Sequence, residues 1–258
     1  MSKTFVLIHG TWHGGWAWKG VVSHLSAKGY RAYAPTLAGH GPGETRSGVT
    51  HYDCVNSVVS CIQQGGLDDV ILVGHSFGGT VVQRAAEEIG DRITRIVFLD
   101  ALVLDRNQSV FEILPTAFLD SLQPKNNGGQ GATSSSDSSE FAIPPWETWR
   151  DNFMQDAAEE HAWLMWEQLT PEPAQVNLDK LDLGRFHSLN IIPKSYVYCR
   201  QDRAMPSGYF HPGMSSRLGA CKVVEMDGSH EVMFTRPAEL ADKIIEASSE
   251  SPDGEAPR

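Results

Sequence analysis

The chain of 258 residues has little of what binding to nucleic acid or to a membrane requires. Its formal net charge is −11, and no cluster of Lys and Arg offers the positive surface that a phosphate backbone needs. No uninterrupted apolar run approaches the length of a membrane span, and no basic region with a following apolar stretch precedes Phe5. We therefore expect no nucleic-acid partner and no membrane partner, and a cytoplasmic location.

Cysteine is scarce as well. The four cysteines, at positions 54, 61, 199 and 221, form neither a CxxC pair nor the dense pattern of a secreted disulfide framework. Buried thiols are the better expectation. Most of the histidines lack the spacing of metal ligands, namely His13, His40, His51, His161, His187 and His211. We expect neither a metal nor an organic cofactor.

What the sequence does contain is an alternation of short β-branched or aromatic runs with helical patterns, which is typical of parallel strands joined by crossover helices. The fold class predicted is α/β, with about six mostly parallel strands buried between helices. The expected strands are 5–8, 31–34, 70–73, 93–99, 196–199 and 222–226. The expected helices are 16–27, 52–63, 80–88 and 237–247.

The alternation stops between Leu104 and Asn190. We interpret 105–190 as a mainly helical lid inserted after the fourth strand, over the carboxyl ends of the strands, where open α/β sheets bind ligands. Within it, 124–140 is rich in Gly, Ser, Asn and Gln and is expected to be flexible, whereas 153–169 is expected to be a helix. The core is then 1–104 with 191–247, and 248–258 is expected to be a disordered tail.

A serine in a glycine-rich turn is the first sign of chemistry. Ser76 lies in Gly74-His75-Ser76-Phe77-Gly78, between an apolar strand and a helical pattern. A sharp turn from strand to helix lifts a serine hydroxyl to the rim of a sheet, and small residues two positions before and after it allow that turn. Because short patterns of this kind also arise by chance, the assignment of Ser76 as a nucleophile depends on its partners.

A nucleophilic serine needs a base and an acid that orients the base. His230 lies in a turn after the last expected strand, and Asp202 lies just beyond the preceding strand. The chain order is then Ser, Asp, His. Asp100, which ends the fourth strand, is a rival for the acid.

Acyl transfer also needs two N–H groups that bind the oxyanion, and the backbones of Thr11 and Phe77 can supply them. His9 and His75 lie near these turns, and we assign them no chemical role. Candidate substrate-binding residues are Gly10, Trp12, Trp146, Trp149, Trp163 and Trp166. The aromatic residues of the lid favour an apolar or aromatic substrate, although they can equally pack the lid itself. These aromatic residues are Phe118, Phe141, Trp146, Trp149, Phe153, Trp163 and Trp166.

At this point the chain resembles a family. Residues 5–16, the turn at 74–79, Asp202 and the Gly228-Ser229-His230 turn are similar to those of α/β-hydrolases such as plant methylesterases, hydroxynitrile lyases and bacterial pyrethroid-type carboxylesterases. The resemblance covers about 4–104 and 191–246, and the lid matches only loosely, around 169–173. The family's interval between acid and base implies Asp202 rather than Asp100 as the acid.

The resemblance also separates two modes of cleavage. The cyanohydrin-cleaving lyases of the family carry a threonine after the histidine of the first strand and a lysine after the catalytic histidine, whereas this chain has Gly10 and Glu231. A carboxylate at 231 is expected to repel departing cyanide, and Gly10 to leave room for an acyl oxygen. Both differences favour hydrolysis.

We therefore expect a carboxylic-ester hydrolase that works through an acyl-serine on a small to medium apolar or aromatic ester, with water as second substrate. Three alternatives stay open. They are a carbamate, amide or lactone hydrolase with the same triad, a C–C lyase or cofactor-free oxygenase, and a non-enzymatic receptor for a small ligand. The sequence also leaves open whether two copies form a homodimer.

Overall fold

A six-stranded parallel sheet organises the molecule. The computed structural model describes residues 3–121, 139–188 and 192–249, and within them the strands follow the spatial order β2-β1-β3-β4-β7-β8. Every neighbouring pair in this sheet is parallel. The strands are β1 (Thr4–Ile8), β2 (Arg31–Tyr33), β3 (Val70–His75), β4 (Ile93–Leu99), β7 (Lys194–Cys199) and β8 (Lys222–Met226). The predicted fold class is confirmed.

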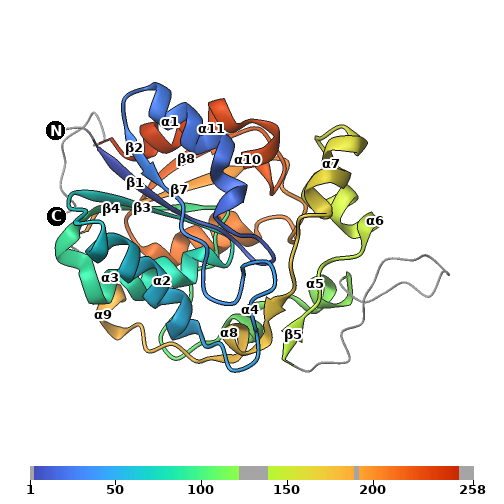
Figure 1. Ribbon diagram of the computed structural model, residues 1–258, viewed down its shortest axis with the longest axis horizontal. Helices are drawn as coiled ribbons and strands as arrows, with labels where there is room; N and C mark the ends of the chain where they lie inside the picture. The colour runs from blue at the N-terminus through green and yellow to red at the C-terminus, as the bar shows by residue number, and fades with distance from the viewer. Residues whose placement is uncertain (1–2, 122–138, 189–191, 250–258) are drawn as a thin grey trace.

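Helices cover both faces of the sheet (Figure 1). Helices α1 (Lys19–Ala27) and α11 (Pro237–Ala247) lie on one face, and α2 (His51–Gln64) and α3 (Gly78–Ile89) lie on the other. Alternate residues of β1 serve the two faces, since Phe5 and Leu7 pack in one apolar cluster and Val6 and Ile8 in the other. This explains why the strands are apolar along their whole length.

The core helices lie close to their predicted positions. Helix α11 has the predicted bounds, and α2 differs from the prediction by one residue at each end. At the start of α2 the Thr50 side chain accepts a hydrogen bond from the Asp53 N–H, and the Asp53 carboxylate accepts one from the Thr50 N–H. This reciprocal cap fixes where the helix begins. The first predicted helix is divided into a 3₁₀ turn (Gly15–Trp18) and α1.

The segment 105–190, called the insertion below, connects β4 to β7 through short elements. Its described parts contain α4 (Val110–Ile113), α5 (Thr116–Ser121), β5 (Glu140–Phe141), α6 (Trp146–Thr148), a π-type turn (Trp149–Phe153), α7 (Glu159–Trp166), β6 (Glu172–Pro173), α8 (Ala174–Leu178) and α9 (Gly184–Ser188). Strands β5 and β6 pair with each other, separately from the main sheet. Figure 1 shows α5, α6 and α7 to one side of the core.

The predicted helix over 153–169 is wrong at its start. Only Glu159–Trp166 is α-helical, because the chain before it is held against the loop that follows β8. Asp156 accepts hydrogen bonds from the Ser229 N–H at 3.2 Å and from the Thr235 hydroxyl at 3.1 Å. These contacts come from distant parts of the chain, so no local pattern reveals them. The stretch 124–140, apart from its last two residues, lies outside the described residues, as does the expected tail from residue 250.

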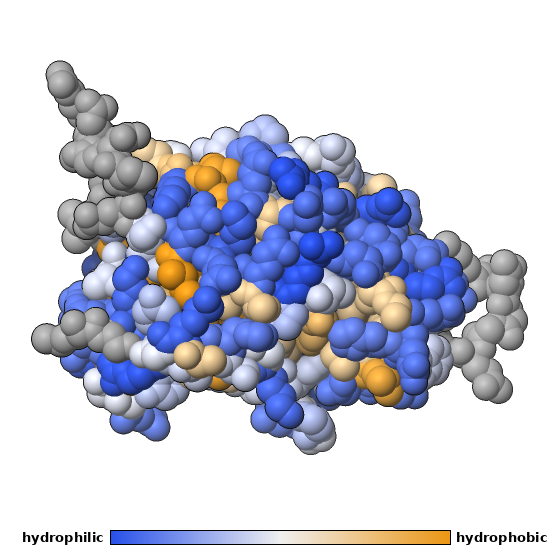
Figure 2. Space-filling view, turned by 90° about the horizontal axis from the view of Figure 1, so that it is seen from above, coloured by the Kyte–Doolittle hydropathy of each residue, from blue (hydrophilic) through white to orange (hydrophobic). Residues whose placement is uncertain are grey.

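Three further elements of the core follow β7 and β8. The chain after β7 forms one π-type and one 3₁₀ segment (Tyr209–Met214 and Ser215–Leu218), and α10 (Val232–Thr235) follows β8. Figure 2, which views the molecule from the side of α1 and α11, shows a mainly hydrophilic face with scattered apolar spots. In the described ranges, no helix has both the length and the apolar character needed to cross a bilayer.

Candidate active site

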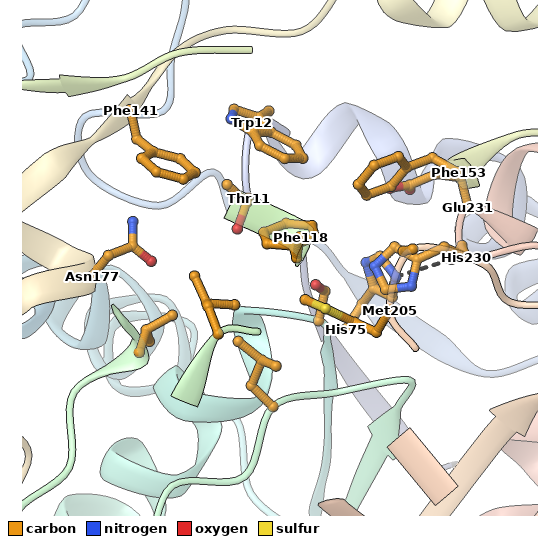
Figure 3. Close-up of a pocket in the computed structure, with 15 residues that line it drawn as sticks. Thr11, Trp12, His75, Phe118, Phe141, Phe153, Asn177, Met205, His230 and Glu231 are labelled. Carbon is orange, nitrogen blue, oxygen red and sulfur yellow. Dashed lines mark hydrogen bonds between the residues drawn. The ribbon is translucent and has the colours of Figure 1, made fainter. Parts of the chain in front are cut away.

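The predicted site residues follow the carboxyl ends of separate strands. Thr11 follows β1, Ser76 follows β3, Asp202 follows β7 and His230 follows β8. Because all these strands are parallel, their carboxyl ends meet at one edge of the sheet. Thr11, Ser76 and His230 line the same cavity at that edge. Figure 3 labels Thr11 and His230 in this lining. The structure thus brings together residues that are far apart in the sequence.

Ser76 lies on a strained turn. Its φ is +50°, which is uncommon for a residue with a Cβ. The conformation is fixed from both sides, because the Ser76 N–H donates to the Leu99 carbonyl at 3.2 Å and the Ser76 carbonyl accepts from the Leu102 N–H at 3.0 Å. A Cβ on Gly74 would lie 2.6 Å from the Gly78 carbonyl oxygen, so the turn needs glycine there.

His230 is held by an acid and by aromatic rings. Its Nδ1 lies 2.6 Å from Oδ2 of Asp202, and its side chain is 3% exposed. Its ring stacks on Phe210 at 5.3 Å between centroids and meets the edge of Phe153 at 5.6 Å. Burial lowers the pKa of His230, but the charge and hydrogen bond of Asp202 outweigh it and raise the pKa to about 9. Asp202 itself is oriented by the Ala204 N–H, which donates to Oδ1 at 2.8 Å.

The nucleophile and the base are adjacent without being bonded. Among the described residues, the Ser76 hydroxyl has no hydrogen bond to His230, although both line one cavity. Hydrogen bonds of this kind are often long in the absence of substrate and tighten only in the complex. The arrangement is therefore compatible with proton transfer from Ser76 to His230 once a substrate is bound.

Asp100, the rival for the acid, lies in the same cluster. It is fully buried, and both of its carboxylate oxygens face the Cys199 N–H, at 3.2 and 3.1 Å. It makes no hydrogen bond to His230 among the described contacts, whereas Asp202 does. Burial, together with the charge of Asp202, raises the pKa of Asp100 well above its ordinary value. The geometry thus favours Asp202 as the partner of His230.

The two candidate oxyanion donors lie on either side of Ser76. Phe77 is buried immediately before α3, so its N–H belongs to the unsatisfied donors of a helix start, where the helix dipole favours negative charge. Thr11 belongs to the turn after β1 and lines the cavity, whereas Phe77 is absent from the described lining. Within the described residues, neither N–H has a protein acceptor. Donors without a protein acceptor are what an oxyanion hole requires.

A carboxylate from the insertion holds the Thr11 turn. Trp12 has a φ of +68°, and its N–H donates to Oε2 of Glu172 in β6 at 3.0 Å. The same oxygen lies 3.2 Å from Nε2 of His40, and both side chains are completely buried. Burial lowers the pKa of His40, but the charge of Glu172 outweighs it, so the pKa is raised overall. The sequence analysis missed this pair, since neither residue lies in a pattern that signals a buried ion pair.

Three further histidines fix backbone groups. His9 donates from Nδ1 to the Gly10 carbonyl at 2.9 Å and accepts the Leu37 N–H at Nε2. His75 donates from Nε2 to the His230 carbonyl at 3.1 Å. His13, expected to be an ordinary polar residue, donates from Nδ1 to the Thr11 carbonyl at 2.7 Å. Burial lowers the pKa of His9, His13 and His75, so these imidazoles are neutral.

Glu231 and Gly10 differ from their expected roles. Burial raises the pKa of Glu231 to about 8, so near neutral pH this side chain is mostly an uncharged acid rather than the carboxylate assumed from the sequence. Its Oε2 lies 3.5 Å from Nε2 of His13. Gly10 is absent from the described cavity lining, and a Cβ there would lie 2.9 Å from Ser76 Cβ. The small size of Gly10 therefore serves the close approach of the Thr11 turn to Ser76.

The cavity beside Ser76 has about 470 Å³ of empty space, counted together with the solvent at its mouth, and is mainly apolar. Four aromatic side chains line it, from Trp12, Phe118, Phe141 and Phe153 (Figure 3). Aliphatic groups and Met205 complete the apolar wall, and Asn177 adds an amide away from His230. This lining fits an apolar or aromatic group.

The four insertion tryptophans are absent from this described lining, which corrects their tentative assignment to substrate binding. Trp146, Trp163 and Trp166 pack on one another, with centroids 4.9 to 6.1 Å apart. Trp149 is fully buried and donates to the Ala162 carbonyl at 3.0 Å. The physical reason is that the insertion buries a core of its own around Trp149, on which Trp146 and Trp166 pack, whereas Trp163 is 40% exposed.

Among the residues that the structure describes, two clusters of His and carboxylate side chains have the spacing of a metal site. One is His75 with His230 and Glu231, and the other is Asp100 with Asp202 and His230. Both depend on His230, whose Nδ1 is bonded to Asp202. We assign His230 and Asp202 to acid–base chemistry rather than to metal binding.

Fold and site together define a class of protein, and residues 5–243 match the model of the alpha/beta hydrolase family. The chain belongs to this family. Its relatives include a carbendazim hydrolyzing esterase from Nocardioides, 32% identical over 93% of this chain and 97% of the relative. Methylesterase 2 of Arabidopsis thaliana is 27% identical over 95% of each chain.

A solved structure is also similar to the chain throughout. It is that of an extracellular alpha/beta hydrolase from Paenibacillus, described as sharing structural and functional homology with tobacco salicylic acid binding protein 2. The identity is 38% and the TM-score 0.87, over 96% of this chain and 100% of that one. The similarity thus includes the insertion as well as the core.

Proposed function

We propose that the protein is a serine carboxylesterase acting on a small to medium apolar or aromatic ester. The observation that carries the proposal is the hydrogen-bonded pair of His230 and Asp202 beside Ser76, at the wall of an apolar cavity. The esterases and methylesterases among the relatives support the same reaction class. The insertion acts as the lid, because it supplies Phe118, Phe141 and Phe153 to the cavity.

The reaction follows from the positions of the groups. His230 takes the proton of Ser76 as its oxygen attacks the ester carbonyl, and Asp202 stabilises the resulting imidazolium. The N–H groups of Thr11 and Phe77 bind the oxyanion of the tetrahedral intermediate. His230 then protonates the leaving alcohol. Water, deprotonated by His230, attacks the acyl-serine and releases the acid.

The experiment that tests this is replacement of Ser76. In a folded Ser76→Ala variant, we expect hydrolysis of p-nitrophenyl butyrate to fall about 10⁴-fold or more. The unmodified protein should form a covalent adduct on Ser76 with an organophosphonate, detected by peptide mass spectrometry. Near-normal turnover by Ser76→Ala, or an adduct elsewhere, contradicts the mechanism.

The alternatives are separated by a substrate panel. Matched methyl esters, amides, carbamates and lactones should be compared with carbendazim, for which one relative is named. The cyanohydrin-cleaving lyases of the family carry a threonine at the position of Gly10. In this chain the Cβ of such a residue would lie 2.9 Å from Ser76 Cβ, so cyanohydrin cleavage is disfavoured. A receptor without activity is excluded if Ser76 turns over p-nitrophenyl acetate repeatedly.

We also propose a cytoplasmic location. All four cysteines are free thiols, which suits a reducing compartment. The Paenibacillus relative is described as extracellular, so fractionation of the native host decides the point. Activity found in the culture medium contradicts the proposal.

A further inference from the structure

Asp100 is a buried carboxyl that the mechanism above does not use. It follows β4 with a φ of +34°, a conformation uncommon for a residue with a Cβ. Such strain persists where surrounding contacts fix it, and it gathers at functional sites. Here the Tyr196 hydroxyl both accepts the N–H and donates to the carbonyl of Ala101, each at 2.9 Å. The Asp100 N–H also donates to the Val197 carbonyl at 3.0 Å.

This backbone places the Asp100 side chain beside the acid–base pair. An oxygen of Asp100, an oxygen of Asp202 and a ring nitrogen of His230 all lie within 4.8 Å of one another. Asp202 makes the 2.6 Å contact with Nδ1 of His230. Asp100 is therefore near enough for a charge on it to act on the imidazolium, and burial weakens the screening of that charge.

Two carboxyl groups this close do not readily ionise together. The titratable groups around Asp100 are Asp202, His230, Cys199 and Tyr196, and burial with the charge of Asp202 raises the pKa of Asp100 well above its ordinary value. The resting pair thus has its charge on Asp202, which is bonded to His230, and a proton on Asp100. If Asp202 is removed, the main repulsive charge acting on Asp100 goes with it.

The two acids also share a separate opening. A second cavity, with about 750 Å³ of empty space, is lined by both acids and by Arg200 and Arg203. Ser76 and His230 are absent from its described lining and belong to the substrate cavity. Asp100 has no exposed surface but borders this cavity, so its proton has a route toward solvent that does not pass through the substrate cavity.

We propose that Asp100 is a second positioning acid for His230, which takes over the stabilisation of the imidazolium when Asp202 is lost. The inference rests on the proposed mechanism with Ser76, His230 and Asp202. In the absence of Asp202, Asp100 releases its proton through the second cavity, and its carboxylate then faces the protonated His230. No other group or co-reactant is needed.

The test is a double-mutant cycle on the full chain with p-nitrophenyl butyrate. We expect Asp202→Ala to lower kcat only about 10²-fold and Asp100→Asn to lower it several-fold, since the amide still accepts the Cys199 N–H. The double variant should lose about 10⁴-fold, more than the two single losses multiplied. Losses that simply multiply would overturn the proposal. Asp202→Ser serves in the same cycle if Asp202→Ala does not fold.

A pH profile separates positioning from a structural role. For Asp202→Ala, kcat should rise with pH as Asp100 ionises, and the double variant should lack this rise. Asp227→Asn is the matched control, because Asp227 is an exposed acid that is paired with Arg200 and absent from the described linings of both cavities. Adding it to Asp202→Ala should change neither kcat nor the profile. The same profile in Asp202→Ala and the double variant contradicts the inference.

Organophosphonate titration of Ser76 counts functional sites in each variant, so loss of folded protein is not mistaken for loss of kcat. The outcomes also separate the two proposals. If Ser76→Ala stays active, the esterase mechanism fails and this inference with it. If Ser76→Ala is inactive and the cycle is multiplicative, only the role of Asp100 fails.

Discussion

The parallel-sheet core and the insertion contribute to the candidate active site in different ways. The core supplies Ser76, Asp202 and His230 from strand ends that the hydrogen bonds of the sheet hold in register. The insertion supplies a cavity wall built on short helices, with one buried carboxylate, Glu172, that reaches into the core. The comparison teaches that chemistry and substrate fit are anchored separately. Changes in the core should act mainly on kcat, and changes in the insertion mainly on KM.

Among the substitutions that test this comparison, the largest effect is expected for Gly10→Thr, in the core. The new Cβ would lie 2.9 Å from Ser76 Cβ and 3.0 Å from Nδ1 of His75, so the Thr11 turn and the nucleophile must move apart. We expect kcat to fall about 10³-fold, since both the attacking oxygen and an oxyanion donor are displaced. The measurement is steady-state hydrolysis of p-nitrophenyl butyrate.

The control for this substitution is Gly90→Thr, where the added Cβ meets only the flexible end of Ile192 at 3.2 Å. It should leave kcat within about twofold, as surface changes away from special contacts usually do. If the Gly10→Thr variant is as active as Gly90→Thr, then the Thr11 turn does not need a glycine at position 10.

Glu172→Ala is the exception to this division, because Glu172 belongs to the insertion and yet its loss should lower kcat. Without the carboxylate, the Trp12 N–H loses its acceptor and the His40 charge is left buried without a partner. We expect kcat to fall about 10²-fold, as for loss of an oxyanion donor, and unfolding free energy to fall by about 3 kcal/mol. Denaturant titration with parallel kinetics measures both.

Glu172→Gln is the matched variant. Its amide oxygen can still accept the Trp12 N–H, while the charge opposite His40 is removed. We expect it to recover much of kcat but less of the stability. Equal losses of kcat in both variants would mean that charge, rather than the hydrogen bond to the turn, sets the oxyanion geometry.

The same division explains what the sequence could predict. The strands and helices of the core follow from apolar runs and periodicity, and the positions of Ser76, Asp202 and His230 follow from where those strands end. The contact between Glu172 and Trp12 joins residues 160 positions apart, and no local pattern encodes it. The insertion tryptophans were misplaced because composition does not show which aromatic side chains pack together and which face a cavity.

The pH profile sharpens the description of the core. His230 must be neutral to act as a base, and Asp202 raises its pKa to about 9. We therefore expect kcat/KM to rise with pH, by about tenfold per pH unit on the acid side of this pKa. The midpoint of this rise, called the acid limb below, should lie well above 6.5, the ordinary pKa of histidine. Initial rates between pH 5 and 10, corrected for spontaneous hydrolysis, measure the limb.

Glu231→Gln tests a neighbour of that base. A charge on Glu231 contributes to the raised pKa of His230, so its removal should move the limb to lower pH. Because burial raises the pKa of Glu231 to about 8, the two profiles should differ most above that pH. If the midpoint of the acid limb of kcat/KM in the unmodified protein lies at or below pH 6.5, the coupling of His230 to Asp202 is contradicted.

The smallest effect is expected in the insertion, for Phe141→Ala. Phe141 lines the cavity and stacks on Trp12 at 6.3 Å, without touching Ser76 or His230 in the described contacts. Its loss removes apolar contact with the substrate in the ground state and the transition state alike, so KM for an aromatic ester should rise about fivefold with little change in kcat. Leu164→Ala, at a half-exposed position on α7, should change neither constant. If Phe141→Ala instead lowers kcat and leaves KM unaltered, the insertion wall aligns the reacting groups, and the separation of chemistry from substrate fit does not hold.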